Sequence, residues 1–175
     1  MSIRTLPILL AITASLAANA VQAATTGTLR FAGVVNAGTC NLAAGDLNRT
    51  ITLPPIKISD FGANPNAGSF DFDISADCES DLRNVIFLFT GPPSAGNAAL
   101  FANTGTSGGT ALWLLHRAPT LYTIPANGTA AQRSRTIATS SNRAVIPLRA
   151  SYHKTGAAIT QGTLASAVTV SITYN

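Results

Sequence analysis

The strongest constraint on the fold is a two-residue alternation at the end of the sequence, "GTLASAVTVSITYN". The alternate positions share one face of an extended strand: Gly162, Leu164, Val168, Val170, Ile172 and Tyr174. Similar alternation recurs in "TGTLRFAGVV" and "SFDFDISADC", and turn-forming segments such as "GANPNAG" separate the strands. No long stretch keeps the 3.6-residue period of an amphipathic helix. We therefore predict an all-β sandwich or barrel.

Four other segments add detail to this prediction. "RNVIFLFTG" and "TALWLLHR" are continuously apolar, which predicts strands that are buried on both faces. "RTITLPPIKI" is interrupted by Pro54 and Pro55, which predicts an edge strand or two short pieces. The segment from Gly91 to Thr110 is rich in Gly, Ala and Ser, and it predicts a long surface loop or short turns.

Residues 1–23 have the pattern of a secretory signal peptide. Arg4 precedes the apolar stretch "LPILLAITASLAANAV", and "VQA" provides a small-residue cleavage site. The apolar stretch is short for a membrane span and no stop-transfer charges follow it. We expect an exported chain of one domain, with no membrane span after cleavage.

Cys40 and Cys78 are the only two cysteines, and in an exported chain an even number predicts a disulfide. Closing a loop of 38 residues stabilises a fold by roughly 4 kcal/mol in the chain-entropy model. A redox or metal-binding pair is disfavoured, because the spacing is not CxxC and no His lies nearby.

Charge is sparse, at 10% of residues with a net charge of +4. Arg133, Arg135 and Arg143 lie near one another, but no aromatic pattern accompanies them. We interpret them as part of a solvated face and expect no nucleic-acid partner. So few charges also indicate a surface that packs against copies of itself.

Five polar residues occupy every second position of one segment: Asp71, Asp73, Ser75, Asp77 and Glu79. A calcium loop has such spacing, but Ala76 stands where that loop needs Gly and Leu82 where it needs Glu. The solvent face of a strand has the same spacing. His116 and His153 lack a carboxylate or Cys at ligand spacing, and no nucleophile elbow or phosphate-binding loop is present. We expect no metal, no cofactor and no enzymatic activity.

The two ends of the chain have matching patterns. Near the N-terminus, one face of an alternating segment carries Gly27, Leu29, Phe31, Gly33 and Val35. The C-terminal strand has no following segment to cover its outer edge, and an open apolar edge invites pairing with another chain. We predict that the N-terminal segment of one copy fills the groove beside the C-terminal strand of another.

These features together resemble the pilin subunits of chaperone–usher fimbriae, most closely the type 1-like structural pilins. The resemblance rests on "GTLRFAGVVNAGTC", "FDFDISADC", "NRAVIPLRASYHKTGAAITQG" and the terminal strand. In that family a Gly lies fourteenth from the C-terminus and a Tyr is penultimate. Gly162 and Tyr174 occupy those places here.

The resemblance implies an incomplete immunoglobulin-like β-sandwich that lacks its last strand. A periplasmic chaperone would lend a strand to the groove, and an outer-membrane usher would exchange it for the N-terminal extension of the next subunit. The implied organisation is a signal peptide at 1–23, a donor-strand extension at 24–36 and a pilin domain at 37–175. The implied donor face is Gly27, Leu29, Phe31, Gly33 and Val35. The implied acceptor residues are Gly162, Leu164, Val168, Val170, Ile172 and Tyr174, with the carboxylate of Asn175 as the chaperone's anchor.

The implied function is that of a structural subunit of an adhesive fimbrium, exported through the periplasm to the bacterial surface. Its partners would be the chaperone, the usher and other pilin subunits. One alternative is a minor, adaptor or glycan-binding subunit of the same fimbria. A small periplasmic hydrolase is another, and it is disfavoured because no nucleophile–base arrangement is present.

Overall fold

The computed structural model describes residues 28–175. The expected signal peptide and Gly27 of the expected donor face lie outside these residues. The chain divides between Val35 and Asn36 into two units.

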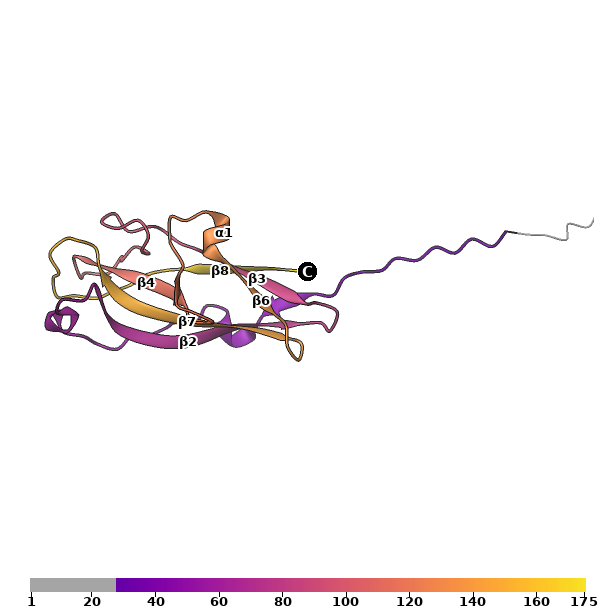
Figure 1. Cartoon of the computed structure of the whole chain (residues 1–175), viewed down its shortest axis with the longest axis horizontal. Helices are drawn as coiled ribbons and strands as arrows, with labels where there is room; N and C mark the ends of the chain where they lie inside the picture. Colours follow the sequence, from indigo (N-terminus) through magenta and orange to yellow (C-terminus); the bar gives the residue numbers. More distant parts are fainter. Residues whose placement is uncertain (1–27) are drawn as a thin grey trace, which may run out of the picture. The chain divides into compact units, whose positions relative to one another are not determined.

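The regular secondary structure of the larger unit, residues 36–175, consists mainly of β-strands (Figure 1). Its strands are β1 (Cys40–Leu42), β2 (Asn66–Cys78), β3 (Asn84–Thr90), β4 (Thr110–His116), β5 (Tyr122–Thr123), β6 (Ser134–Ala138), β7 (Arg143–Lys154) and β8 (Thr169–Tyr174). Three short helical turns, η1 (Ala44–Asp46), η2 (Ile58–Phe61) and α1 (Ala130–Arg133), connect them. Between residues 28 and 175, no helix combines the length and the hydropathy that crossing a bilayer requires.

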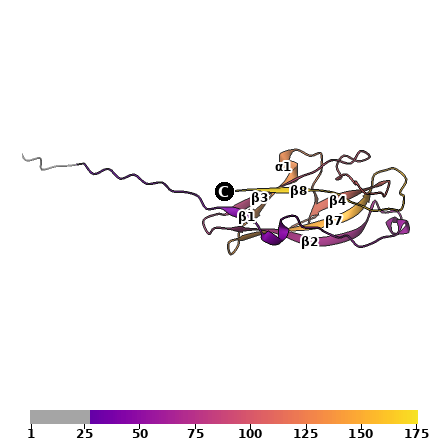
Figure 2. The ribbon, with the colours of Figure 1, turned by 180° about the vertical axis from the view of Figure 1, so that it is seen from behind.

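The strands form two antiparallel sheets (Figures 1 and 2). One has the order β1-β2-β7-β4-β5 and the other has the order β6-β3-β8. The two longest strands, β2 and β7, pair continuously from Phe70 with Ala150 to Asp77 with Arg143. This arrangement confirms the predicted all-β class.

The core lies between the two sheets. Strand β3 contributes Val85, Phe87 and Phe89, which are buried, while its intervening residues are half-buried. Ile146 and Leu148 of β7 belong to the same buried cluster. The continuous apolar run in β3 was predicted to be buried on both faces, and the structure buries one face completely and the other in part.

The Gly/Ala/Ser-rich segment between β3 and β4 was predicted to be a long surface loop or short turns, and it does form short turns, but it does not lie wholly on the surface. Leu100 and Phe101 are buried, and Phe101 forms an isolated β-bridge with Leu112 of β4. The main-chain N–H of Phe101 donates to the Leu112 carbonyl at 2.9 Å. Composition alone indicated a loop, whereas two large apolar residues bring the segment against the core.

The predicted disulfide between Cys40 and Cys78 is present and joins directly opposite positions of β1 and β2. Just before β1, the N–H of Gly38 donates to Asp81 Oδ2 at 2.8 Å, and the N–H of Thr39 donates to a Glu79 carboxylate oxygen at 3.0 Å. The start of this unit is therefore fixed to β2 and to the turn that follows it.

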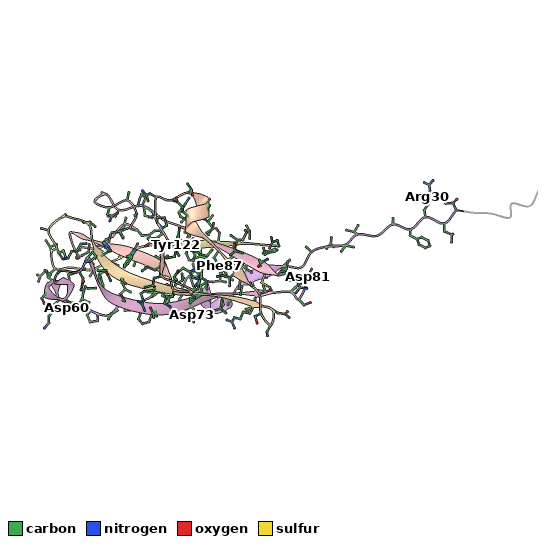
Figure 3. The ribbon with its side chains drawn as sticks, in the orientation of Figure 1. Arg30, Asp60, Asp73, Asp81, Phe87 and Tyr122 are labelled. Atoms are coloured by element: carbon green, nitrogen blue, oxygen red, sulfur yellow. A yellow bond between two sulfur atoms is a disulfide. The ribbon has the colours of Figure 1, made fainter. Side chains whose placement is uncertain are left out.

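The acidic positions of β2 lie on its outer face, as alternation predicts (Figure 3 labels Asp73). Asp71 accepts two hydrogen bonds from Arg149, at 2.6 and 2.9 Å, and these lower the pKa of Asp71. Nη2 of Arg117 lies 3.1 Å from Oδ1 of Asp73. Asp71 thus forms an ion pair with the opposite residue of β7, and Asp73 forms one with the residue that follows β4.

Residues 28–35 form the described part of the smaller unit, and they contain no helix or strand. Their large apolar side chains are exposed: Leu29 by 82%, Phe31 by 91%, Val34 by 86% and Val35 by 99%. The segment was predicted to be a strand. A strand is stabilised by ladder hydrogen bonds to a neighbour, and residues 28–35 take part in no ladder.

Candidate functional site

Strand β8 is an edge strand. Within residues 36–175, only β3 pairs with it. Next to β8, Asn175 and Asn84 exchange both main-chain hydrogen bonds, each at 3.2 Å. Because bonded and non-bonded pairs alternate along an antiparallel ladder, the odd-numbered residues of β8 bond to β3. The even-numbered residues Val170, Ile172 and Tyr174 direct their N–H and C=O groups to the open edge.

The same even-numbered residues direct their side chains inward. Val168, Val170 and Ile172 are partly buried against the core, whereas the odd-numbered residues between them are exposed. Tyr174 remains 39% exposed. A strand added beside β8 would therefore find main-chain partners and an apolar face at the same residues.

Residues 162–168 extend the line of β8 without belonging to a strand. The alternation predicted a strand from Gly162, but the strand begins at Thr169, because the ladder with β3 ends at the pair Thr90–Thr169. A Cβ atom on Gly162 would collide with the main-chain N of Ser107 and lie 2.6 Å from the carbonyl carbon of Thr106. Gly162 thus permits a close approach between this segment and the loop before β4.

The opposite wall of the site is the segment 48–58, which runs between the helical turns η1 and η2. Ile51, Leu53 and Ile56 are half-buried, and their neighbours in the segment are mostly exposed. The prediction of an edge strand or two short pieces was wrong here, since no strand forms. Pro54 and Pro55 have no N–H to donate to a ladder.

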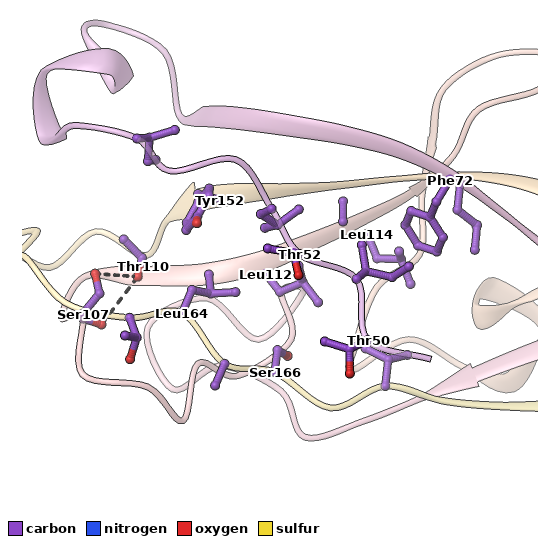
Figure 4. Close-up of a pocket in the computed structure, with 18 of the residues that line it drawn as sticks. Thr50, Thr52, Phe72, Ser107, Thr110, Leu112, Leu114, Tyr152, Leu164 and Ser166 are labelled. Carbon is purple, nitrogen blue, oxygen red and sulfur yellow. Dashed lines mark hydrogen bonds between the residues drawn. The ribbon is translucent and has the colours of Figure 1, made fainter. Parts of the chain in front are cut away.

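Between these two walls lies an apolar groove of about 1500 Å³ (Figure 4). Its floor includes Phe72 of β2, Leu112 and Leu114 of β4, and Tyr152 of β7. Of the predicted acceptor residues, four line the groove: Gly162, Leu164, Val168 and Val170. Ile172 packs against the core and Tyr174 lies near the end of β8, and neither lines the groove.

The beginning of the 48–58 wall is tied to β2 through Asp46. Its carboxylate accepts hydrogen bonds from the main-chain N–H of Ser75 at 2.8 Å and from Arg49 at 2.9 Å. Arg49 also donates to the Asp73 carbonyl at 2.8 Å. Burial acts to raise the pKa of Asp46, but the hydrogen bonds from Ser75 and Arg49 outweigh it and the pKa is lowered.

Comparison with known proteins identifies the class of protein that carries this groove. The sequence model of the family described as fimbrial protein matches residues 29–175. The chain belongs to the fimbrial protein family. The resemblance inferred from the sequence is confirmed, and the family is not a class of enzymes.

Individual relatives agree with this assignment. The type-1 fimbrial protein A chain of Escherichia coli K12 is 29% identical to this fimbrial protein, over 99% of this chain and all of the relative. The P pilus rod subunit PapA has a TM-score of 0.62 at 20% identity, covering 78% of this chain and 99% of PapA. A chain in a chaperone–usher pilus structure has a TM-score of 0.59 at 20% identity, and the match covers 86% of this chain and 96% of the pilus chain. These matches show the predicted immunoglobulin-like β-sandwich fold.

Several residues of the fimbrial protein's groove were not predicted from the sequence. The floor residues Leu112 and Tyr152 lie on inward faces that alternation could identify, but which inward residues stay uncovered depends on the arrangement of distant strands. Asp46 lies in a short turn with no recognisable motif. Ser166 shares the inward face of the 162–168 segment, and its hydroxyl is buried without a hydrogen-bond partner among the described residues.

Proposed function

We propose that this fimbrial protein is a structural pilus subunit that polymerises by donor-strand exchange. One observation carries the proposal. Val170 and its even-numbered neighbours in β8 direct unpaired main-chain N–H and C=O groups to the open edge of the sheet, and the same residues direct apolar side chains inward. An added strand would pair with the edge of β8 while its alternate side chains enter the groove. The names of PapA and of the type-1 relative support a role in a pilus.

The proposed donor is the N-terminal segment of the next copy. Leu29, Phe31 and Val35 are exposed apolar side chains at alternate positions, Gly33 lies between them, and Gly27 precedes the described residues. Burying the three large side chains contributes roughly 5–9 kcal/mol as an upper bound, at about 1.5–3 kcal/mol each. That free energy, repeated at each junction, gives a fibre whose subunits separate slowly.

A periplasmic chaperone and an outer-membrane usher are the proposed partners before assembly. The chaperone's strand occupies the groove first, and the carboxylate of Asn175 is its anchor. The C-terminal end has a defined position, because one oxygen of the Asn175 carboxylate accepts hydrogen bonds from the main-chain N–H groups of Arg83 at 3.0 Å and Asn84 at 3.2 Å. The product is an extracellular fimbrium on the bacterial surface that supports adhesion.

The test compares the full chain with a variant that lacks residues 24–33. Surface filaments are purified, heated stepwise in detergent and separated on a gel. We expect the full chain to give a ladder of multimers and the shortened variant to remain monomeric, because it keeps the groove and loses the donor. Filaments formed by the shortened variant alone would refute the proposal. Filaments that contain this chain only as an occasional subunit would instead indicate a minor or adaptor role.

A further inference from the structure

We propose that the loop Asn103–Gly108 acts as a permanent substitute for a neighbouring strand, and that Asn103 positions the far half of the acceptor edge. The far half is defined here as residues 162–168, and the near half as β8. This inference rests on the proposed strand-accepting function and concerns how the groove is kept ready for the donor.

The far half needs a source of order other than the sheet. The ladder between β3 and β8 ends at Thr90 and Thr169, so residues 162–168 receive no support from β3. An extended segment without a ladder loses conformational entropy on being fixed and gains no strand hydrogen bonds in return. Nevertheless, Leu164, Ser166 and Val168 keep the alternating burial of β8.

The loop before β4 supplies the missing hydrogen bonds. The N–H of Thr104 donates to the Ala165 carbonyl at 2.8 Å, and the N–H of Ser107 donates to the Thr163 carbonyl at 3.0 Å. Both acceptors belong to odd-numbered residues, the same set that bonds to β3 further along the chain. The even-numbered residues of the far half therefore keep their main-chain groups directed to the open edge, in register with β8.

One side chain joins the loop to the far half through both ends of its amide. Asn103 Nδ2 donates to the Ser107 carbonyl at 2.9 Å and to the Thr163 carbonyl at 3.4 Å. Asn103 Oδ1 accepts from the N–H of Gly105 at 2.8 Å and from the N–H of Ala165 at 2.9 Å. Carbonyl partners on one side and N–H partners on the other require an amide, which neither aspartate nor leucine can replace.

The glycines of the same region provide an independent indication. A Cβ atom on Gly105 would collide with the Thr163 carbonyl oxygen, and one on Gly91 would lie 2.8 Å from the Ala167 carbonyl oxygen. The far half thus approaches the backbone of the loop at Gly105, and that of the residue after β3 at Gly91, more closely than a residue with a side chain allows. The Gly-rich composition of this segment reflects the close approach.

The experiment measures hydrogen exchange of the acceptor edge on donor binding. The full chain carries Phe31→Asp, which suppresses self-assembly, and a synthetic peptide with the natural sequence of residues 24–36 is added as donor. We expect the peptide to protect the amides of Leu164 and Ser166 in the far half together with those of Val170 and Ile172 in the near half. With Asn103→Ala added, protection of the far half should fall by at least about tenfold, while the near half stays protected.

Matched variants separate positioning from general stability. Asn97→Ala is the control, because Asn97 also lies between β3 and β4 but outside the loop Asn103–Gly108. The Asn97 side chain accepts a hydrogen bond from the nearby N–H of Ala99, at 3.2 Å, and its removal should leave both halves protected. Asn103→Asp keeps the acceptor and loses the donor, so it should reduce protection of the far half as well. Equal protection of the far half with and without Asn103, or an equal loss in both halves, would overturn the inference. If the peptide protects neither half while Asn103 is intact, the proposed function itself fails.

Discussion

Replacing Phe31 with alanine tests the donor segment most directly. Phe31 is 91% exposed in the single chain, so almost all of its apolar surface is available for burial at a junction between subunits. Removing a phenylalanine side chain from a buried site costs about 3–5 kcal/mol, more than the burial contribution alone, because it also leaves a cavity, and 3 kcal/mol corresponds to a factor of about 100. We expect filaments of Phe31→Ala to release subunits about 100 times faster than the natural filaments, because most of an affinity change lies in the dissociation rate.

The assay incubates purified filaments in detergent at a fixed temperature and measures monomer on a gel against time. Val34 and Val35 provide a matched comparison, since both are exposed valines but they lie on opposite faces of the alternating segment. We expect Val35→Ala to accelerate dissociation and Val34→Ala to change it little. Unchanged dissociation of Phe31→Ala, or a larger effect of Val34→Ala than of Val35→Ala, would refute the proposed donor face.

Three further predictions concern the sandwich itself. Each compares the free energy of unfolding in urea between the natural chain, with its disulfide formed, and a variant. Replacing Cys40 and Cys78 with serine should lower the free energy of unfolding by about 4 kcal/mol, because it reopens a 38-residue loop in the unfolded chain. Ser166→Ala should raise it by about 1 kcal/mol, because it removes a buried hydroxyl that has no partner among the described residues. The hydrogen bonds to Asp46 lower its folded pKa below 3.8, so its contribution is complete above that pH and is lost as the pH falls through the folded pKa. Asp46→Asn should therefore reduce the loss of stability below about pH 4.

Each of these three predictions has a result that contradicts it. Equal midpoints for the chains with and without the disulfide would show that the 38-residue loop is restrained in some other way. A destabilising Ser166→Ala substitution would show that the hydroxyl has a partner. An identical acid dependence for Asp46→Asn would assign that dependence to the other carboxylates, such as Asp71.

Local patterns in the sequence predicted the strands that carry their own signal. The alternation around Asp71 and Asp73 predicted β2 and its outer face, because side-chain direction in a strand depends only on residue parity. The disulfide was predictable because two cysteines allow a single pairing. The inward direction of the even-numbered side chains of β8 follows from the same parity.

Features that depend on contacts between distant segments were not predictable in this way. The strand β8 starts at Thr169 because its ladder with β3 ends at Thr90, and nothing near Thr169 in the sequence records that fact. Leu100 and Phe101 are buried through a bridge to Leu112, although their neighbours have the composition of a loop. Two hydrogen bonds of Asn103 join it to Thr163 and Ala165, about 60 positions away, where local patterns carry no information.

The position of the disulfide has a mechanical consequence for the proposed fibre, in which residues 28–35 would join one subunit to the next. Tension on that segment enters the sandwich at Asn36 and reaches Cys40 within a few residues. There the covalent bond to Cys78 transfers the force to β2, whose ladder with β7 is the longest in the molecule. Force that enters the sandwich through the N-terminal segment therefore bypasses the short strand β1 and reaches the β2–β7 ladder through a covalent bond.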